Sequence, residues 1–151
     1  IVSLIFWLKR MMSLKDFIAY VVMQISGAIF GCVVANIIFK LPPVTISTLV
    51  RHDFSQFLSE ILATFGLVLV IFIGSEVSKQ NIPVLVGSYI TSAYWFTSST
   101  SFANPAVTFA RQLSDTFTGI SPSGVPTFIT AQIFGAILGF VVIQWLTNKV
   151  I

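Results

Sequence analysis

Long apolar stretches separated by short polar ones dominate the hydrophobic pattern of this chain. A helix that crosses a bilayer needs about 20 largely apolar residues. Four stretches approach this length, and we predict a membrane-spanning helix in each: residues 14–39, 54–75, 82–99 and 125–148. A fifth apolar stretch, residues 1–12, is too short to span and ends in Lys9 and Arg10.

Residues 100–115 predict a helix that enters the membrane without crossing it. Asn is a favoured helix cap and Pro a favoured first helical residue, so Asn104 and Pro105 mark a helix start. From Asn104 to Asp115 the helix would measure about 18 Å, roughly half the hydrocarbon thickness. We therefore expect it to leave on the side where it entered. The alternative is an ordinary cap in a surface loop.

An internal repeat links two of the predicted spans. Gln24, Gly27 and Gly31 recur 108 positions later as Gln132, Gly135 and Gly139. With a re-entrant segment before the last span, the two copies run in opposite directions, as in transport proteins whose pore lies at the interface of inverted repeats. The paired glycines, Gly27 with Gly31 and Gly135 with Gly139, predict close helix crossings.

Composition agrees with a membrane protein and argues against an enzyme. Hydrophobic residues make up 56% of the chain and charged residues 9%, against about 25% charged in soluble domains. The basic residues are scattered, which argues against a nucleic-acid surface. With one His, one Cys and one Glu within a predicted span, the chain has no paired carboxylates, no metal-ligand cluster and no nucleophile triad. We therefore expect no cofactor.

The sequence resembles the aquaporin and glycerol-facilitator family. The resemblance lies in Ser101-Phe102-Ala103-Asn104-Pro105-Ala106, in the later Ala131-Gln132-Ile133-Phe134-Gly135-Ala136, and in Glu60 with Thr64. It implies an all-α, right-handed bundle of six spanning helices and two half-helices around a pore. This chain would supply four spanning helices, the half-helix after Asn104 and, in residues 1–12, the end of the other half-helix.

The resemblance also implies roles for single residues. Asn104, Pro105 and Ala106, which match the family's Asn-Pro-Ala box, would start the pore half-helix. Val107 stands directly after the box, where most family members have Arg, and would line a constriction with Ser92 and Ser101. Glu60, with Thr64, would brace the loop before Asn104, the alternative being a Glu60 that reaches water at a helix end. Arg111 is expected to be solvated or paired with Asp115.

These expectations define a function. The chain should be a passive channel for water, glycerol-like polyols and, from its likeness to a bacterial branch encoded near arsenic-resistance genes, uncharged trivalent arsenic hydroxide. A homotetramer in the bacterial inner membrane is implied, and a non-conducting scaffold subunit is the alternative. Allowing for a loop three residues longer in the second half, the repeat places Ile1 opposite Ala106, so we expect Asn-Pro immediately before Ile1. The family topology places these residues on the cytoplasmic side, as the positive-inside bias favours: Lys9, Arg10, Lys15, Lys79 and Lys149.

Overall fold

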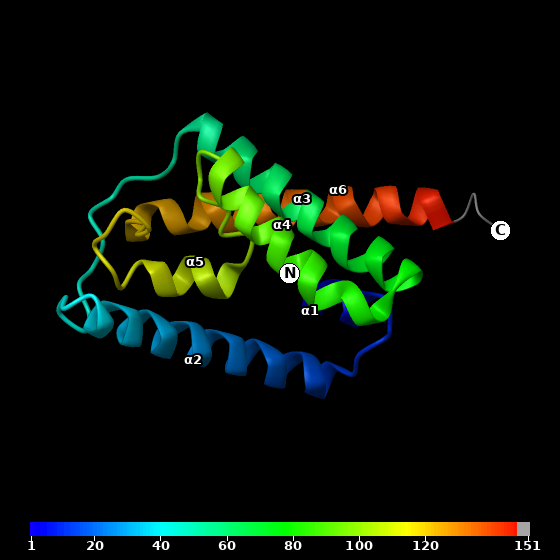
Figure 1. Ribbon diagram of the computed structural model, residues 1–151, viewed down its shortest axis with the longest axis horizontal. Coiled ribbons are helices and arrows are strands. Elements are labelled where there is room, and N and C mark those ends of the chain that lie inside the picture. Colours follow the sequence, from blue (N-terminus) through cyan, green and yellow to red (C-terminus); the bar gives the residue numbers. More distant parts are fainter. Residues whose placement is uncertain (148–151) are drawn as a thin grey trace.

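Helices form the regular structure of residues 1–147, which the computed structural model describes, and no strand occurs among these residues (Figure 1). The α-helices are α1 (Val2–Leu8), α2 (Leu14–Ile38), α3 (Phe54–Val77), α4 (Ile82–Phe96), α5 (Pro105–Arg111) and α6 (Val125–Thr147). Two short 3₁₀ turns, η1 (Lys79–Asn81) and η2 (Pro122–Gly124), precede α4 and α6. The predicted all-α class is confirmed, while the last position of the predicted span 125–148 and the predicted cytoplasmic Lys149 lie outside the described residues.

Three of the described helices, rather than the predicted four, are long and apolar enough to cross a membrane. They are α2, α3 and the stretch Pro122–Thr147 that contains α6. The predicted span 82–99 forms the 15-residue helix α4, about 22 Å long at 1.5 Å per residue. Pro83 in its first turn fixes the start, and at Thr97 the backbone becomes extended. The polar residues after Phe96 therefore belong to the next loop.

The predicted half-helix also ends earlier than the sequence suggests. Helix α5 stops at Arg111, four residues before Asp115. The carbonyls of Gln112 and Leu113 accept hydrogen bonds from the backbone N–H groups of Ser47 and Thr45, at 2.8 and 3.0 Å. Because the α2–α3 loop occupies these carbonyls, the chain turns away from the helix axis at this point. Helix α5 is seven residues long and lies between α2 and α6 (Figure 1).

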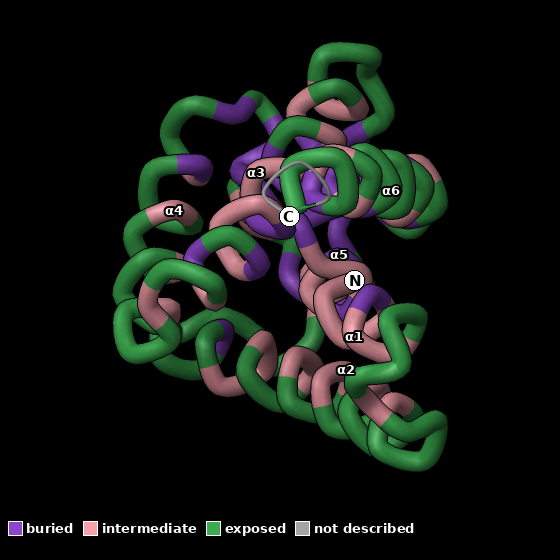
Figure 2. The backbone as a smooth tube through the Cα atoms, turned by 90° about the vertical axis from the view of Figure 1, so that its right-hand side faces the viewer, coloured by how far each residue is buried: buried purple, intermediate pink, exposed green. Residues whose placement is uncertain are grey.

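Helices α3 and α6 cross in close contact. A Cβ added to Gly135 would overlap the carbonyl oxygen of Ile61, and one added to Gly139 would lie 2.9 Å from Val68 Cγ1. The missing side chains therefore let the two backbones approach. Figure 2 shows the buried residues concentrated where α3, α5 and α6 meet. This pair of helices forms the rigid wall on which the candidate site is built.

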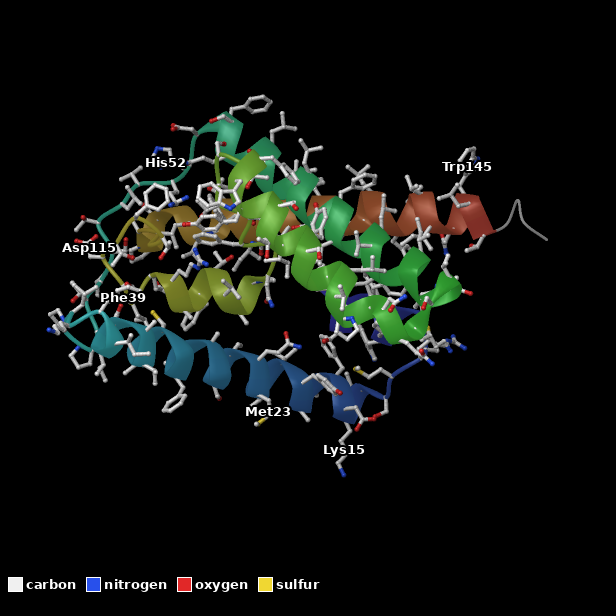
Figure 3. The ribbon with its side chains drawn as sticks, in the orientation of Figure 1. Lys15, Met23, Phe39, His52, Asp115 and Trp145 are labelled. Atoms are coloured by element: carbon white, nitrogen blue, oxygen red, sulfur yellow. The ribbon has the colours of Figure 1, made fainter. Side chains whose placement is uncertain are left out.

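The equivalent crossing predicted at Gly27 and Gly31 is absent from residues 1–147. No described atom of another element lies within 4 Å of a Cβ built on either glycine, so the crossing at these two glycines stays a prediction. Both positions are open within residues 1–147 because only one side of α2 is covered, by α1 and α5. Met23 of α2 is 71% exposed and points away from the other helices in Figure 3.

Replacing Gly135 by Ala should destabilise the protein more than replacing Gly27 by Ala. The first change places a methyl group against the Ile61 carbonyl in a packed crossing, whereas the second places it in open space. We expect a difference of about 1–3 kcal/mol from overpacking. Thermal unfolding of the two purified variants in detergent measures it, and equal unfolding temperatures would show that the α3–α6 crossing is looser than the structure has it.

Candidate functional site

The loop between α4 and α5 has an unusual backbone. Thr100, Ser101 and Ala103 have positive φ angles of 61°, 49° and 48°. Residues with side chains avoid this left-handed region, at a cost of about 1–2 kcal/mol each. Such a backbone persists only where neighbouring groups hold it in place. The residues that hold this loop therefore define the candidate site.

Glu60, on the second turn of α3, holds the loop. Its side chain is fully buried. One carboxylate oxygen accepts from the backbone N–H of Phe102 at 2.8 Å and from the Ser99 hydroxyl at 2.7 Å, and the other accepts from the N–H of Ala103 at 2.9 Å. Gln132 of α6 donates its amide to the second oxygen at 2.7 Å. Four donors surround a carboxylate that would otherwise be very costly to bury.

The same glutamine ties the loop to α5. Gln132 also donates to the Thr108 hydroxyl at 2.8 Å, and that hydroxyl donates to the carbonyl of Asn104 at 3.0 Å. In the first half of the repeat, Gln24 donates to Ser3 Oγ at 3.0 Å. Gln24 corresponds to Gln132 at the offset of 108, and Ser3 corresponds to Thr108 once a loop three residues longer in the second half is allowed for. Each half therefore joins its long helix to its half-helix by an equivalent hydrogen bond.

Thr64 does not take part in this network. It is fully buried next to Gly135, but its hydroxyl has no hydrogen-bond partner among the described residues. The prediction that it shares the bracing role of Glu60 is therefore wrong. A helical spacing of four residues places both side chains on one face of α3, yet the loop lies against Glu60 and α6 against Thr64.

The Asn104-Pro105-Ala106 sequence starts α5 as its residue types predict. Asn104 Oδ1 accepts from the N–H of Ala106 at 2.9 Å, and Pro105 occupies the first helical position. The Asn104 amide nitrogen donates no hydrogen bond within residues 1–147. Because an amide carries two N–H donors, Asn104 retains two free donors at the start of α5.

The three predicted constriction residues are on separate elements. Ser92 is exposed on α4 and donates to the carbonyl of Ser88, whereas Ser101 is 7% exposed and its hydroxyl has no partner among the described residues. Val107, on the first turn of α5, is half-buried against the cluster of Phe102, Ile120, Val125 and Phe128. No described contact joins the three, so their shared constriction stays a prediction.

Arg51 is a site residue that sequence reasoning did not select. It lies in the loop before α3 and is 3% exposed. Its guanidinium donates to the carbonyls of Gly119 at 2.7 Å, Ser99 at 3.0 Å and Phe117. Burial lowers the pKa of Arg51 from its ordinary value, although a guanidinium keeps its charge in a protein. The neighbouring His52 is exposed (Figure 3). Because an arginine beside other polar loop residues is usually exposed, the sequence gave no sign that Arg51 is buried.

Ser99 connects Arg51 to Glu60. Its carbonyl accepts from Arg51, and its hydroxyl donates to the Glu60 carboxylate. Two buried groups of opposite charge thus hold the same residue from two sides. The loop before α3, the loop before α5 and the α3–α6 wall form one polar network.

Replacing Arg51 by Lys should destabilise this network. Lysine keeps the charge but lacks the planar group that reaches three carbonyls, and an unsatisfied buried carbonyl costs about 1–3 kcal/mol. We expect a lower unfolding temperature in detergent for Arg51→Lys. The control is Arg10→Lys at an exposed position; a similar loss in both variants would remove the special role assigned to Arg51.

Arg111 is half-buried and does not form the ion pair with Asp115 that the sequence allowed. Its guanidinium lies over the Phe102 ring, 4.4 Å from the centroid, and donates to the carbonyl of Thr118 at 3.3 Å. Asp115 accepts from the backbone and hydroxyl of Thr48. The expected i, i+4 ion pair fails because α5 ends at Arg111 and Asp115 is no longer on the same helix.

Comparisons with known proteins identify a family to which the chain is similar. Residues 1–98 match the model of the Major intrinsic protein family, and the match stops before Asn104. The chain is 47% identical over 145 residues to the aquaglyceroporin AqpS of Rhizobium meliloti (strain 1021), covering 96% of this chain and 62% of that relative. No solved structure matches it. The family match and the identity together show that this chain belongs to the major intrinsic protein family.

Proposed function

We propose that this chain forms the wall and outer half of a passive channel for small uncharged solutes. The observation that carries the proposal is the loop at residues 99–103, which is held in a strained conformation by the buried Glu60 and ends at the free amide of Asn104. A free amide and a strained backbone inside an apolar bundle cost free energy. That cost is expected where backbone lines a water-filled path.

The proposed solutes rest on the predicted lining of the constriction. Val107 stands where most family members have Arg, and Ser92 and Ser101 add short, uncharged side chains. This lining favours a neck wide enough for polyols as well as water. The relative AqpS is named an aquaglyceroporin, which supports water and glycerol as solutes. Uncharged trivalent arsenic hydroxide has a similar size and hydrogen-bonding character, and we include it.

A non-conducting scaffold is the alternative, and the polar network argues against it. A scaffold gains nothing from a buried carboxylate that fixes a strained loop, because an apolar core of the same shape is at least as stable. Bilayer residence follows from the family and the three long apolar helices. We further propose the inner membrane of a bacterium and assembly as a homotetramer with one pore in each subunit.

Solute uptake by vesicles that contain the full-length protein tests the proposed channel. Stopped-flow light scattering records volume recovery with glycerol as solute, shrinkage for water, and arsenous acid in a third series. We expect rates several-fold above those of protein-free vesicles for glycerol and water. Rates equal to those of protein-free vesicles for every solute, with the protein folded and inserted, would support the scaffold.

A further inference from the structure

Arg111 is a cationic side chain that makes no hydrogen bond to the polar network around Glu60. A surface groove of about 230 Å³ runs between α2 and α5, and its lining includes Ala28, Cys32, Asn36, Val107, Arg111 and Thr118. It extends from Val107, on the first turn of α5, to Arg111 at the C-terminal end of that helix. Arg111 therefore shares a groove with the predicted constriction residue.

Arg111 is fixed by a rigid platform. The Phe102 ring beneath it is 4% exposed, packs against Phe128 with ring centroids 5.1 Å apart, and has its backbone N–H held by Glu60. A guanidinium over an aromatic face gains about 0.5–2 kcal/mol from the cation–π attraction. Because the platform cannot move without breaking the loop, the charge of Arg111 has a defined position.

The two arginines on Phe102 are used differently. Arg51 lies 5.5 Å from the ring centroid and donates to three carbonyls. Arg111 makes one described hydrogen bond, the 3.3 Å contact to Thr118, although a guanidinium has five N–H donors. Most of the donor capacity of Arg111 is thus available to the groove.

No described residue that lines the groove is acidic. Glu60 is fully buried behind the loop with four donors around it, and Asp115 is bound to Thr48. The positive charge of Arg111 is therefore not neutralised on the groove side. A fixed, uncompensated charge beside a narrow path repels ions of the same sign and leaves neutral solutes free to pass.

We propose that Arg111 is the residue that excludes cations at the outer mouth, in the absence of an arginine directly after the Asn104-Pro105-Ala106 box. The inference rests on the proposed channel. Arg111 lies one helical turn beyond Val107, so the charge is set back from the neck. This position separates two properties: Val107 sets the width for neutral solutes, and Arg111 sets the discrimination against cations.

The test measures potassium flux and glycerol flux on the same vesicles containing the full-length protein. Arg111→Gln, which keeps hydrogen-bond donors but removes the charge, should raise potassium flux about tenfold or more and leave glycerol flux within about twofold. Arg111→Lys should retain the low potassium flux of the wild type. Thr118→Asp, which places a carboxylate beside Arg111 in the same groove, should raise potassium flux as Arg111→Gln does.

Each outcome decides the assignment. Low potassium flux in a folded Arg111→Gln protein overturns it and leaves Arg111 as a structural contact between α5 and Thr118. If Arg111→Gln does not fold, unchanged potassium flux in Thr118→Asp overturns it instead. Absence of glycerol flux in the wild type is a different result, because it rejects the channel itself.

Discussion

Replacing Glu60 by Gln should abolish solute transport and lower the stability of the protein. Glutamine offers one acceptor oxygen where the structure uses two, and its NH₂ group would face the donors that the carboxylate now accepts. Each donor left unpaired in such a buried site costs about 1–3 kcal/mol, and the substitution would leave more than one. We expect an apparent unfolding temperature in detergent at least about 10 °C lower, and glycerol flux at the level of protein-free vesicles.

The matched control is Glu76→Gln on the same helix. Glu76 is exposed near the C-terminal end of α3, so its replacement should change neither property measurably. Both variants remove one carboxylate from α3, but only Glu60→Gln removes the group that holds the loop. Normal glycerol flux in a stable Glu60→Gln protein would show that the loop keeps its conformation without the carboxylate.

Replacing Val107 by Arg should reduce glycerol flux much more than water flux. Arginine would add a long, charged side chain at the predicted neck, where polyols need width and water can pass in single file. We expect glycerol flux to fall about tenfold or more and water flux by less than about threefold. The new charge would be four residues from Arg111, a like-charge spacing that costs only a few tenths of a kcal/mol on a helix, so the fold should persist.

Val107→Ala provides the control for this prediction. It removes two methyl groups from a half-buried position and should leave glycerol flux unchanged or higher. Both variants are measured by stopped-flow light scattering at equal protein density. If arginine at position 107 leaves glycerol flux unchanged, Val107 does not line the narrowest part of the path.

The helices and the half-helix start could be predicted because they depend on local signals. Apolar length predicts α2, α3 and α6, and the Asn104 cap with Pro105 predicts the start of α5. The end of α5 could not be predicted, since it depends on N–H groups of Thr45 and Ser47, far away in the sequence, that donate to the carbonyls of Leu113 and Gln112. Gly27 and Gly135 occupy equivalent positions of the repeat but have different surroundings, for the same kind of reason. The repeat predicts a glycine at both positions, whereas the contact at Gly135 depends on a neighbouring helix, α3, that Gly27 lacks.

Of the two buried charged residues in the site, Glu60 could be predicted from the sequence and Arg51 could not. An intramembrane Glu60 attracts attention because an unpaired charge there is costly, and the structure places it against the predicted loop. Arg51 gave no such signal, because an arginine between polar loop residues is usually solvated. Its burial depends on three carbonyls that the fold brings together from two distant loops.

Chemical modification of a cysteine at position 107 tests most directly whether solutes pass along this part of the molecule. The full-length protein would carry Cys32→Ala, which removes the one native cysteine in residues 1–151, together with Val107→Cys. Glycerol flux is measured before and after reaction with a bulky, membrane-impermeant thiol reagent, with Cys32→Ala alone as the control. We predict that glycerol flux falls to the protein-free level in the double variant and is unchanged in the control. Complete modification of Cys at position 107, verified by mass spectrometry, with glycerol flux unchanged would contradict a pore at this site.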